Sequence, residues 1–238
     1  LAKLRKEIGL VAMEGIPSQY YPMIKELGMD ISLVGSHGLK KGPVDPGNHG
    51  ECVQKLTEAI ELCAAAGYKR VITFTGMNAE GIGDEQAEEN CISCRKKVLP
   101  IAEKNKITLC LEHLNSRNDS HPMKGHPGYF GDDVDYCVKM INRIGSSSFK
   151  LLLDVYHVQV MNGDVIRRIN QYKEISRHYH TAENPGRAEL DDEQEINYPG
   201  VMNAILDTGY DGYVAPEFIT TSEDKALALR HAAEICDV

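Results

Sequence analysis

The chain has 238 residues, which is close to the roughly 250 residues of one α/β barrel domain and long for a domain of two packed layers. Hydrophobic residues make up 42% of the sequence and charged residues 26%, which allows a sizeable buried core and argues against disorder. The 26 Lys and Arg against 35 Asp and Glu give a formal net charge of −9, which disfavours nucleic acid as a partner. We therefore expect residues 1–238 to form a single domain that does not bind nucleic acid.

The seven cysteines are an odd number scattered through segments with helical or strand patterns, which is typical of a reducing compartment. Cys91 and Cys94 form a C-x-x-C pair, but no second pair completes a zinc site, so we interpret them as ordinary helix thiols. No apolar run approaches the about 18 residues of a membrane helix, and no signal peptide opens the sequence. We expect a cytoplasmic protein with no membrane partner, or an exported one if a signal preceded residue 1.

Charged amphipathic stretches alternate along the chain with short runs rich in Val, Ile and Leu. Such runs have no polar face, as is typical of parallel strands buried on both faces. Between the runs, apolar residues recur at helical spacing, as at positions 53, 56, 60 and 63 and at positions 134, 137, 138 and 141. Seven strands are predicted: Leu10–Met13, Ile31–Val34, Val71–Phe74, Ile107–Leu111, Lys150–Leu153, His178–Thr181 and Tyr213–Ala215.

This alternation predicts right-handed βα units in a parallel sheet that closes as a (β/α)8 TIM barrel, an α/β fold. The chain opens on a predicted helix, Ala2–Ile8, so the first strand of an eight-stranded barrel would come before Leu1. We expect this first strand to be missing from the sequence, through truncation or processing. Glycines stand where four helices would end in a left-handed residue: Gly28, Gly67, Gly145 and Gly209.

Polar residues follow the apolar runs of the last four predicted strands, and a barrel builds its site at these carboxyl ends. They are Glu112, Asp154, His180 and Glu217. His180 is preferred to His178 because it lies nearer the end of its strand. Taken singly, an acid in this position is often only a helix cap.

Together, three carboxylates and an imidazole near the barrel axis would repel and desolvate one another unless a cation lay between them. We therefore predict one divalent metal ion at this position. Oxygen ligands with one nitrogen favour Mn²⁺, Mg²⁺ or Co²⁺ and allow Zn²⁺.

Two further side chains are predicted at the mouth of this site. His157 stands three residues past Asp154, in reach of a substrate hydroxyl, and Arg187 lies on a Pro-Gly-Arg turn from which it could clamp a carboxylate. The alternative for both is a supporting hydrogen bond or a surface charge. Weaker candidates, which fit loop structure better, are Asn115, His126 and Glu195.

Six segments follow one another in the order seen in hydroxypyruvate isomerases: LEHLNSR, HPGYF, LLLDVYHVQVMNGDVIR, HYHTAENPGR, QEINYP and GYVAPEF. The chain resembles that family, which belongs to the xylose-isomerase-like TIM barrels of the sugar phosphate isomerase/epimerase superfamily, over nearly its whole length. The resemblance implies a (β/α)8 barrel, one divalent cation and the interconversion of small hydroxy-carbonyl compounds such as hydroxypyruvate and tartronate semialdehyde. It also implies metal ligands at Glu112, Asp154, His180 and Glu217, an acid/base pair in the two glutamates, and substrate contacts from His157 and Arg187.

The sequence departs from that family at two positions. Hydroxypyruvate isomerases often have Gln where His180 stands, whereas the related ketose epimerases have His, so a ketose 3-epimerase is an alternative function. Pro216, directly before Glu217, is unusual in a barrel strand because proline cannot donate a hydrogen bond to the ladder.

The predicted reaction passes through an enediolate of the substrate, which a metal would stabilise as a Lewis acid while one glutamate takes the α-proton and the other returns one. An inosose-type dehydratase, which expels a β-hydroxyl from the same enediolate, is a rival. An endonuclease-like phosphodiesterase would need several metals and a basic groove, and only His37 and Glu14 stand near the ends of the early strands. An inactive sugar-binding barrel is a further rival, which the intact Glu112 and Glu217 disfavour. The sequence leaves a homo-oligomer open.

Overall fold

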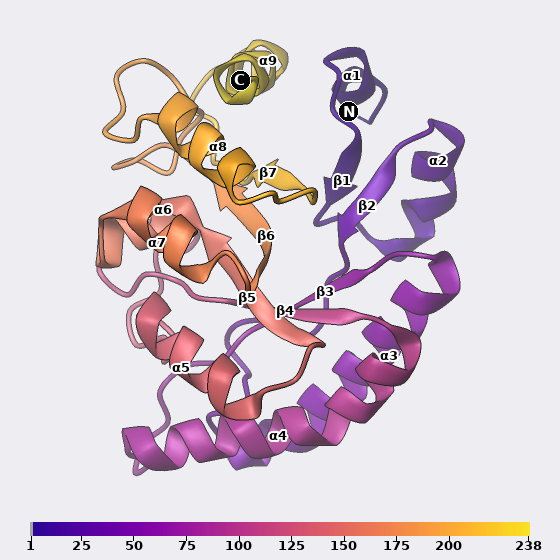
Figure 1. Ribbon diagram of the computed structural model, residues 1–238, viewed down its shortest axis with the longest axis vertical. Coiled ribbons are helices and arrows are strands. Elements are labelled where there is room, and N and C mark those ends of the chain that lie inside the picture. Colours follow the sequence, from indigo (N-terminus) through magenta and orange to yellow (C-terminus); the bar gives the residue numbers. More distant parts are fainter. Residues whose placement is uncertain (1) are drawn as a thin grey trace.

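Parallel strands alternate with helices in the computed structural model, which describes residues 2–238 (Figure 1). The strands are β1 (Ala12–Glu14), β2 (Asp30–Leu33), β3 (Arg70–Thr73), β4 (Thr108–Glu112), β5 (Phe149–Asp154), β6 (Ser176–Thr181) and β7 (Val214–Pro216). The α-helices are α1 (Ala2–Glu7), α2 (Tyr21–Glu26), α3 (His49–Ala66), α4 (Asp84–Asn105), α5 (Val134–Ile144), α6 (Val155–Met161), α7 (Val165–Tyr172), α8 (Tyr198–Asp207) and α9 (Lys225–Cys236). Single 3₁₀ turns occur at η1 (Ser18–Tyr20) and η2 (Pro46–Asn48).

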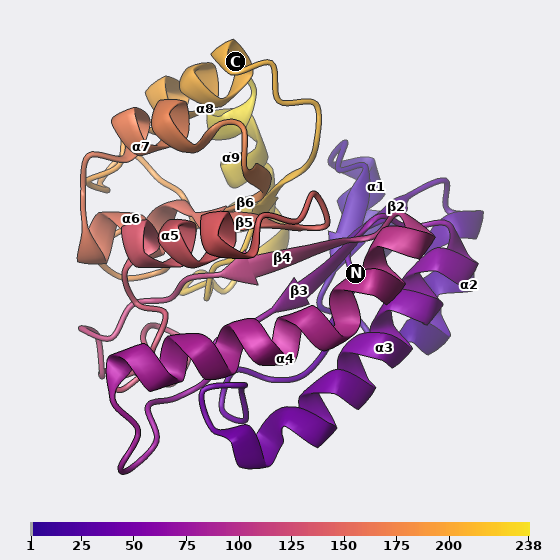
Figure 2. The same ribbon diagram turned by 60° about the horizontal axis from the view of Figure 1, so that its bottom comes forward.

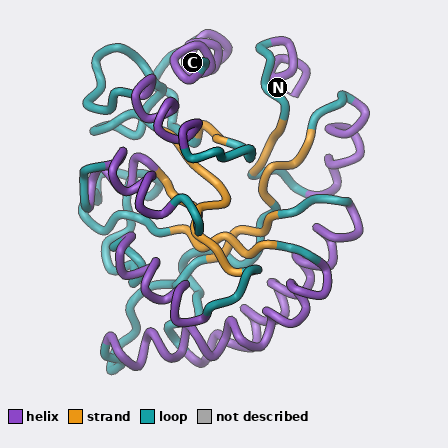
Figure 3. Tube along the Cα trace, in the orientation of Figure 1, coloured by secondary structure: helices purple, strands orange, loops and turns teal. Residues whose placement is uncertain are grey.

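The strands follow one another in chain order around a curled sheet, with the helices on its outer side (Figures 1 and 3). Strands β3 to β7 form one ladder and β1 pairs with β2, while Val34 bridges to Val71 and so links β2 to β3. The predicted alternation and all seven predicted strands are confirmed, with boundaries that differ by a few residues. Among residues 2–238, β1 and β7 are not paired with each other. The missing first strand that the sequence predicts would lie before Leu1, outside the described residues.

The helices end and pack as their sequence patterns predict. All four glycines expected after helices have positive φ, 69°, 84°, 69° and 77° at positions 28, 67, 145 and 209. In α5, all four apolar residues of the predicted face are buried, and α3 and α4 run beside each other along the outside of the sheet (Figure 2). No helix among residues 2–238 combines the length and apolar composition that crossing a membrane requires.

The alternation of side chains along β4 and β5 separates an outer core from the barrel interior. Leu109 and Leu151 face the helices and belong to the main hydrophobic cluster. On the opposite face, Cys110 and Leu152 pack with Leu33 of β2 in a small separate cluster. The next residues on this interior face are those two positions further along, 112 and 154. The interior cluster therefore forms an apolar floor beneath the carboxyl ends of the strands.

Pro216 fits its strand without losing a ladder hydrogen bond. It is the last residue of β7, which lies at the edge of the five-stranded ladder. The carbonyl of Thr181 in β6 accepts instead from the backbone N–H of Glu217, at 2.8 Å. A proline is tolerated at such an edge position, and the following glutamate is held in register by its own N–H.

Truncating a side chain of the outer core tests this packing. Leu151 is fully buried in the main cluster, so we expect Leu151→Ala to lower the free energy of unfolding by about 2–5 kcal/mol, measured by urea denaturation. Leu206 of α8 is 55% exposed, and Leu206→Ala serves as the control with a change of about 0.5 kcal/mol or less. Equal effects of the two substitutions would contradict the assignment of Leu151 to the core.

Candidate metal and active site

Four polar side chains from consecutive strands meet at the carboxyl end of the sheet. Glu112 and Asp154 end β4 and β5, His180 is the next-to-last residue of β6, and Glu217 follows β7 directly. In the ladder, Asp154 pairs with His180 and His180 pairs with Ala215, so the ends of these strands are level. One ligand atom from each of the four residues lies within 4.8 Å of the others. The structure therefore brings together the four residues singled out in the sequence.

The imidazole of His180 stands at the centre of this group. Its Nδ1 lies 3.1 Å from Oε1 of Glu112 and 3.1 Å from Oε2 of Glu217. The side chains of Glu112, Asp154 and His180 are at most 4% exposed, whereas that of Glu217 is 40% exposed. His178, two residues earlier, does not belong to this group of four. His180 is thus the histidine of β6 that faces Glu112 and Glu217.

The two carboxylate oxygens of Asp154 have different contacts. Its Oδ1 accepts a hydrogen bond of 3.1 Å from the backbone N–H of His157 and so caps the start of α6. Its Oδ2 is buried and has no hydrogen-bond partner among the described residues, although Nη2 of Arg187 lies 3.5 Å away. A buried carboxylate oxygen without a donor is costly. The helix cap expected of an isolated acid is therefore present, and a free oxygen remains for the group of four.

Burial and mutual repulsion shift the pKa values of these groups. Burial, and then the charge of Glu217, raise the pKa of Glu112 to about 7. Burial also raises the pKa of Asp154, although Arg187 opposes the rise. Burial alone would lower the pKa of His180, but the surrounding glutamates outweigh it and hold that pKa well above its ordinary value. The group as a whole thus has an excess of negative charge that protons offset when no cation is bound.

Arg187 supplies a positive charge beside two of the carboxylates. Its guanidinium is 4% exposed, and its Nη2 lies 2.5 Å from Oε2 of Glu217 and 3.5 Å from Oδ2 of Asp154. Its Nη1 donates to the backbone carbonyl of Met123 at 2.6 Å. Arg187 has a left-handed backbone conformation with φ of 52°, which is uncommon for a side chain with a Cβ. The guanidinium of Arg187 thus lies between the carboxylates of Glu217 and Asp154 and the backbone carbonyl of Met123.

His157 points toward the site with one nitrogen fixed by a neighbouring loop. Its Nδ1 accepts from the backbone N–H of Asn115 at 3.1 Å. Burial, and then Arg187, lower the pKa of His157 well below its ordinary value, so the ring is neutral. A neutral ring whose Nδ1 accepts carries its proton on Nε2. That buried Nε2 has no hydrogen-bond partner among the described residues and lies 3.6 Å from Oδ2 of Asp154.

Two residues of the site were not predicted as functional residues from the sequence. Asn115 holds His157, as described above, and Glu14 contacts both histidines of β6. Oε2 of Glu14 accepts from Nε2 of His178 at 2.9 Å, and Oε1 lies 2.8 Å from Nε2 of His180. Although burial would raise the pKa of Glu14, the two histidines hold it well below its ordinary value. The sequence pattern indicates that Glu14 lies near the end of a strand, but it does not predict the contacts of Glu14 with the histidines of β6.

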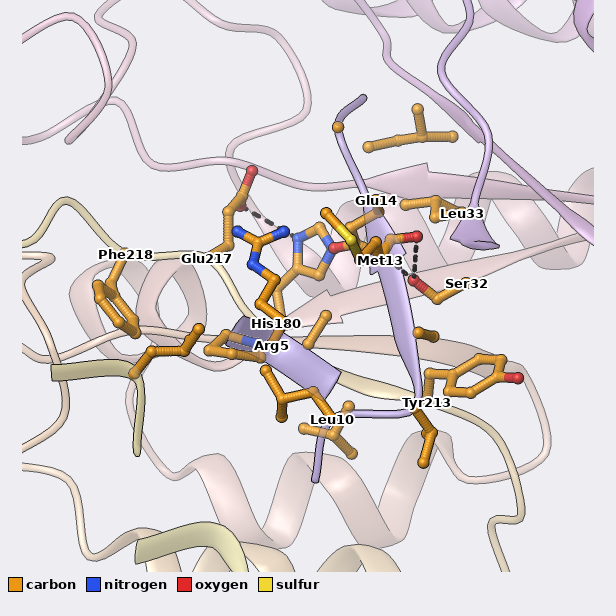
Figure 4. Close-up of a pocket in the computed structure, with 18 of the residues that line it drawn as sticks. Arg5, Leu10, Met13, Glu14, Ser32, Leu33, His180, Tyr213, Glu217 and Phe218 are labelled. Atoms are coloured by element: carbon orange, nitrogen blue, oxygen red, sulfur yellow. Dashed lines mark hydrogen bonds and ion pairs between the residues drawn. The ribbon is translucent and has the colours of Figure 1, made fainter. Parts of the chain in front are cut away.

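A cavity of about 390 Å³ reaches the site between β1, β2 and β7 (Figure 4). Its walls include Met13, Leu33 and Phe218, which are apolar, and Glu14, His180 and Glu217 lie at its polar end. Figure 4 shows His180 between the carboxylates of Glu14 and Glu217.

The remaining candidates from the sequence lie outside the group of four. Nε2 of His37 lies 3.0 Å from the hydroxyl of Thr73, and burial lowers the pKa of His37 to about 3. Glu195 accepts a hydrogen bond from Asn184 in a loop. The thiols of Cys91 and Cys94 are buried in α4 as free cysteines. The ring of His126 packs beside that of His157, with their centroids 6.4 Å apart.

The residues of the group of four fit a divalent cation. Three carboxylates and one imidazole nitrogen are suitable ligands for such an ion, and one ligand atom of each already lies within 4.8 Å of the rest. The partnerless Oδ2 of Asp154 gains a partner if a cation is present. A cation would also offset the charge that raises the pKa of Glu112.

Known proteins similar to this chain include isomerases. A putative hydroxypyruvate isomerase of Homo sapiens is 26% identical over 178 residues, which are 73% of this chain and 62% of that protein. The hydroxypyruvate isomerase of Escherichia coli K12 is also 26% identical, over 173 residues that are 73% of this chain and 64% of that enzyme. The chain thus matches less than two thirds of the length of these curated relatives.

The fold is shared with solved structures. A family 2 AP endonuclease from Brucella melitensis superposes with a TM-score of 0.83 at 23% sequence identity, over 96% of this chain and 89% of that one. Residues 17–236 match the family described as xylose isomerase-like TIM barrel. These similarities confirm the barrel class and the relationship predicted from the sequence. The chain belongs to the xylose isomerase-like TIM barrel family.

Proposed function

We propose that this chain is a metal-dependent isomerase of a small hydroxy-carbonyl compound, of the hydroxypyruvate or tartronate semialdehyde type or a short ketose. The observation that carries the proposal is the meeting of Glu112, Asp154, His180 and Glu217 at the carboxyl ends of four consecutive strands. The names of the isomerases that resemble it support the same reaction class. In this proposal residues 1–238 act as one barrel domain.

The four residues of the group would hold one divalent ion, Mn²⁺, Mg²⁺, Co²⁺ or Zn²⁺. When bound, the ion would supply Lewis-acid polarisation of the carbonyl and neighbouring hydroxyl oxygens of the substrate. Three carboxylate ligands favour the harder ions of this set, and the imidazole nitrogen allows the others.

Glu112 and Glu217 would carry out the proton transfers. One carboxylate removes the proton from the carbon next to the carbonyl, which leaves an enediolate of the substrate, and the other carboxyl group delivers a proton to the neighbouring carbon. One C–H bond breaks, another forms, and a hydroxyl proton moves between the two substrate oxygens, so no redox cofactor is needed. The two glutamates flank Nδ1 of His180, each at 3.1 Å, and are therefore placed around one common position.

His157 and Arg187 would orient the substrate. The neutral ring of His157 offers an N–H at Nε2 that has no other partner among the described residues, so it can donate to a substrate oxygen without losing a bond. Arg187 keeps a positive charge beside Glu217, and its planar guanidinium suits a carboxylate group of the substrate.

A ketose 3-epimerase is the second candidate function. The specific observation in its favour is His180, since the resemblance stated above associates histidine at this position with ketose epimerases and glutamine with hydroxypyruvate isomerases. The same pair of carboxylates would then remove and return a proton at one carbon, from opposite faces. Product analysis separates these reactions, and also separates both from a dehydration.

Adding and removing metal tests the proposed ion site. We expect Mn²⁺ at a free concentration of 100 times Kd to stabilise the dialysed protein by about 2.7 kcal/mol, seen as a higher Tm. Asp154→Asn should remove most of this gain, because the partnerless Oδ2 loses its charge. Asp164→Asn, at a half-exposed position beside Arg167, is the control and should keep the gain. A Tm that does not respond to any of the four ions in the wild type would contradict the site.

The affinity for the ion should depend on pH. An ion needs Glu112 as a carboxylate, and burial raises the pKa of Glu112 to about 7. Below that value the group binds a proton that competes with the ion, and above it the proton is absent. We therefore expect Mn²⁺ binding, measured by calorimetric titration, to weaken as the pH falls from 8 to 6. Equal affinities at these two pH values would show that protons do not compete at the site.

Turnover tests the roles of the two glutamates. At saturating ion, Glu112→Gln and Glu217→Gln should each lower kcat by about 10²–10⁴, because a carboxamide cannot exchange the proton. Glu51→Gln, in a surface ion pair with Lys55, should leave kcat unchanged. The substrates are hydroxypyruvate, tartronate semialdehyde and a panel of short ketoses in D₂O, and deuterium should appear at the reacting carbon. Turnover without deuterium uptake would favour a hydride shift and contradict this mechanism.

A further inference from the structure

Glu14 connects the first described strand to the histidines of β6 across the barrel interior. Its side chain is 19% exposed, and its two oxygens have different partners. Oε2 accepts from the hydroxyl of Ser32 at 2.7 Å and from Nε2 of His178 at 2.9 Å. Oε1 lies 2.8 Å from Nε2 of His180 (Figure 4). The carboxylate is thus held by β2 and one histidine while it faces the other.

The alternation of side chains along β1 places Glu14 on the interior side. Met13 is buried in the outer core, so the residue after it points into the barrel. The register of β1 against β2 shifts between Met13 and Glu14, and Glu14 pairs with Leu33 instead of Ser32. The extra residue in this bulge is Ser32 of β2. Its hydroxyl donates to Oε2 of Glu14 at 2.7 Å.

We propose that Glu14 is a positioning residue that fixes His180 for metal binding. Nε2 of His180 lies 2.8 Å from Oε1 of Glu14 as an ion pair, while Nδ1 lies on the side of the ring that faces Glu112 and Glu217. If Nδ1 binds the proposed ion in place of its contacts of 3.1 Å with Glu112 and Glu217, the remaining proton of the ring must lie on Nε2, beside the carboxylate of Glu14. A carboxylate that receives the second N–H of a metal-binding histidine sets the tautomer and the ring orientation. This inference rests on the proposed metal site but not on the identity of the reaction.

The contacts favour this role over a second ion bound by Glu14, His178 and His180. The ligand atoms of these three residues also lie within 4.8 Å of one another. However, Oε2 of Glu14 already accepts two hydrogen bonds, one of them from the ring N–H of His178. A second ion bound by His178 through Nε2 would have to displace the ring proton that Oε2 of Glu14 accepts. One ion per chain is therefore expected.

Ion affinity measures the role of Glu14 without any need for turnover. We expect Glu14→Ala to weaken Mn²⁺ and Zn²⁺ binding, measured by calorimetric titration, by about 10–100-fold. Glu14→Gln keeps an oxygen that can accept from Nε2, so its affinity should lie between those of Glu14→Ala and the wild type, and it remains informative if the alanine variant does not fold. The stoichiometry should be one ion per chain.

Glu88→Gln is the matched control for the loss of a buried carboxylate. Glu88 is 5% exposed in α4 and accepts from the hydroxyl of Tyr136 at 2.9 Å, in a cluster apart from the strand ends. This substitution should lower Tm while leaving the ion affinity unchanged. A similar loss of ion affinity in Glu88→Gln and Glu14→Ala would show a general effect of destabilisation and would overturn the proposal.

The tautomer of His180 gives the direct readout. In ¹⁵N spectra of the Zn²⁺-loaded protein, Nε2 of His180 should carry the proton and Nδ1 the ion, and the Nε2–H signal should be shifted in Glu14→Gln. Ion binding through Nε2, two ions per chain, no ion uptake by the wild type, or unchanged ion affinity in a folded Glu14→Ala would each overturn the proposal. Ion binding with the expected tautomer but without isomerase turnover would sustain it and refute only the proposed reaction.

Discussion

The concentration of buried carboxylates at the carboxyl end of the sheet is the constraint on which the site depends. Glu112 and Asp154 are almost fully buried, and Glu217 joins them around one imidazole. Repulsion between such groups is strong because water is largely excluded. The chain counters it locally with Arg187 beside two of the carboxylates and with a histidine whose pKa is well above its ordinary value. Each of these features follows from the same excess of negative charge, and so does the fit to a cation.

The fold positions this charge through the two-residue period of its strands. In β4 the interior face carries Cys110 and then Glu112, and in β5 it carries Leu152 and then Asp154. The apolar member of each pair packs in the floor, and the acid stands above it at the strand end. For this reason the sequence could predict both the strands and the four residues that meet. The alternation along a buried strand fixes the direction in which the side chain of a following acid points.

The parts of the site that the sequence did not predict depend on contacts that no local pattern encodes. Glu14 stands at the end of a three-residue strand, and its contacts with β6 join residues far apart in the sequence. His157 was predicted, but the group that fixes its tautomer is a backbone N–H of residue 115, and any residue except proline offers one. Arg187 was predicted to face a substrate, and its contacts with Glu217 and Asp154 come from strands distant in sequence. Contacts across the barrel interior depend on how the sheet curls, whereas a periodic pattern predicts only the class of the fold.

The two sides of the site differ in how firmly the sheet holds them. Asp154 and His180 pair with each other within the five-stranded ladder, and the ends of β5 and β6 are buried. Glu217 follows β7, whose three residues are all partly exposed, and it borders the cavity between β1 and β7. Segments with less burial open at lower free energy than core strands. Glu112, Asp154 and His180 therefore form the rigid part of the group, whereas Glu217 relies on Arg187 and His180 for its position. The acid/base role proposed for Glu217 suits this more accessible side, where a carboxylate can also exchange protons with solvent.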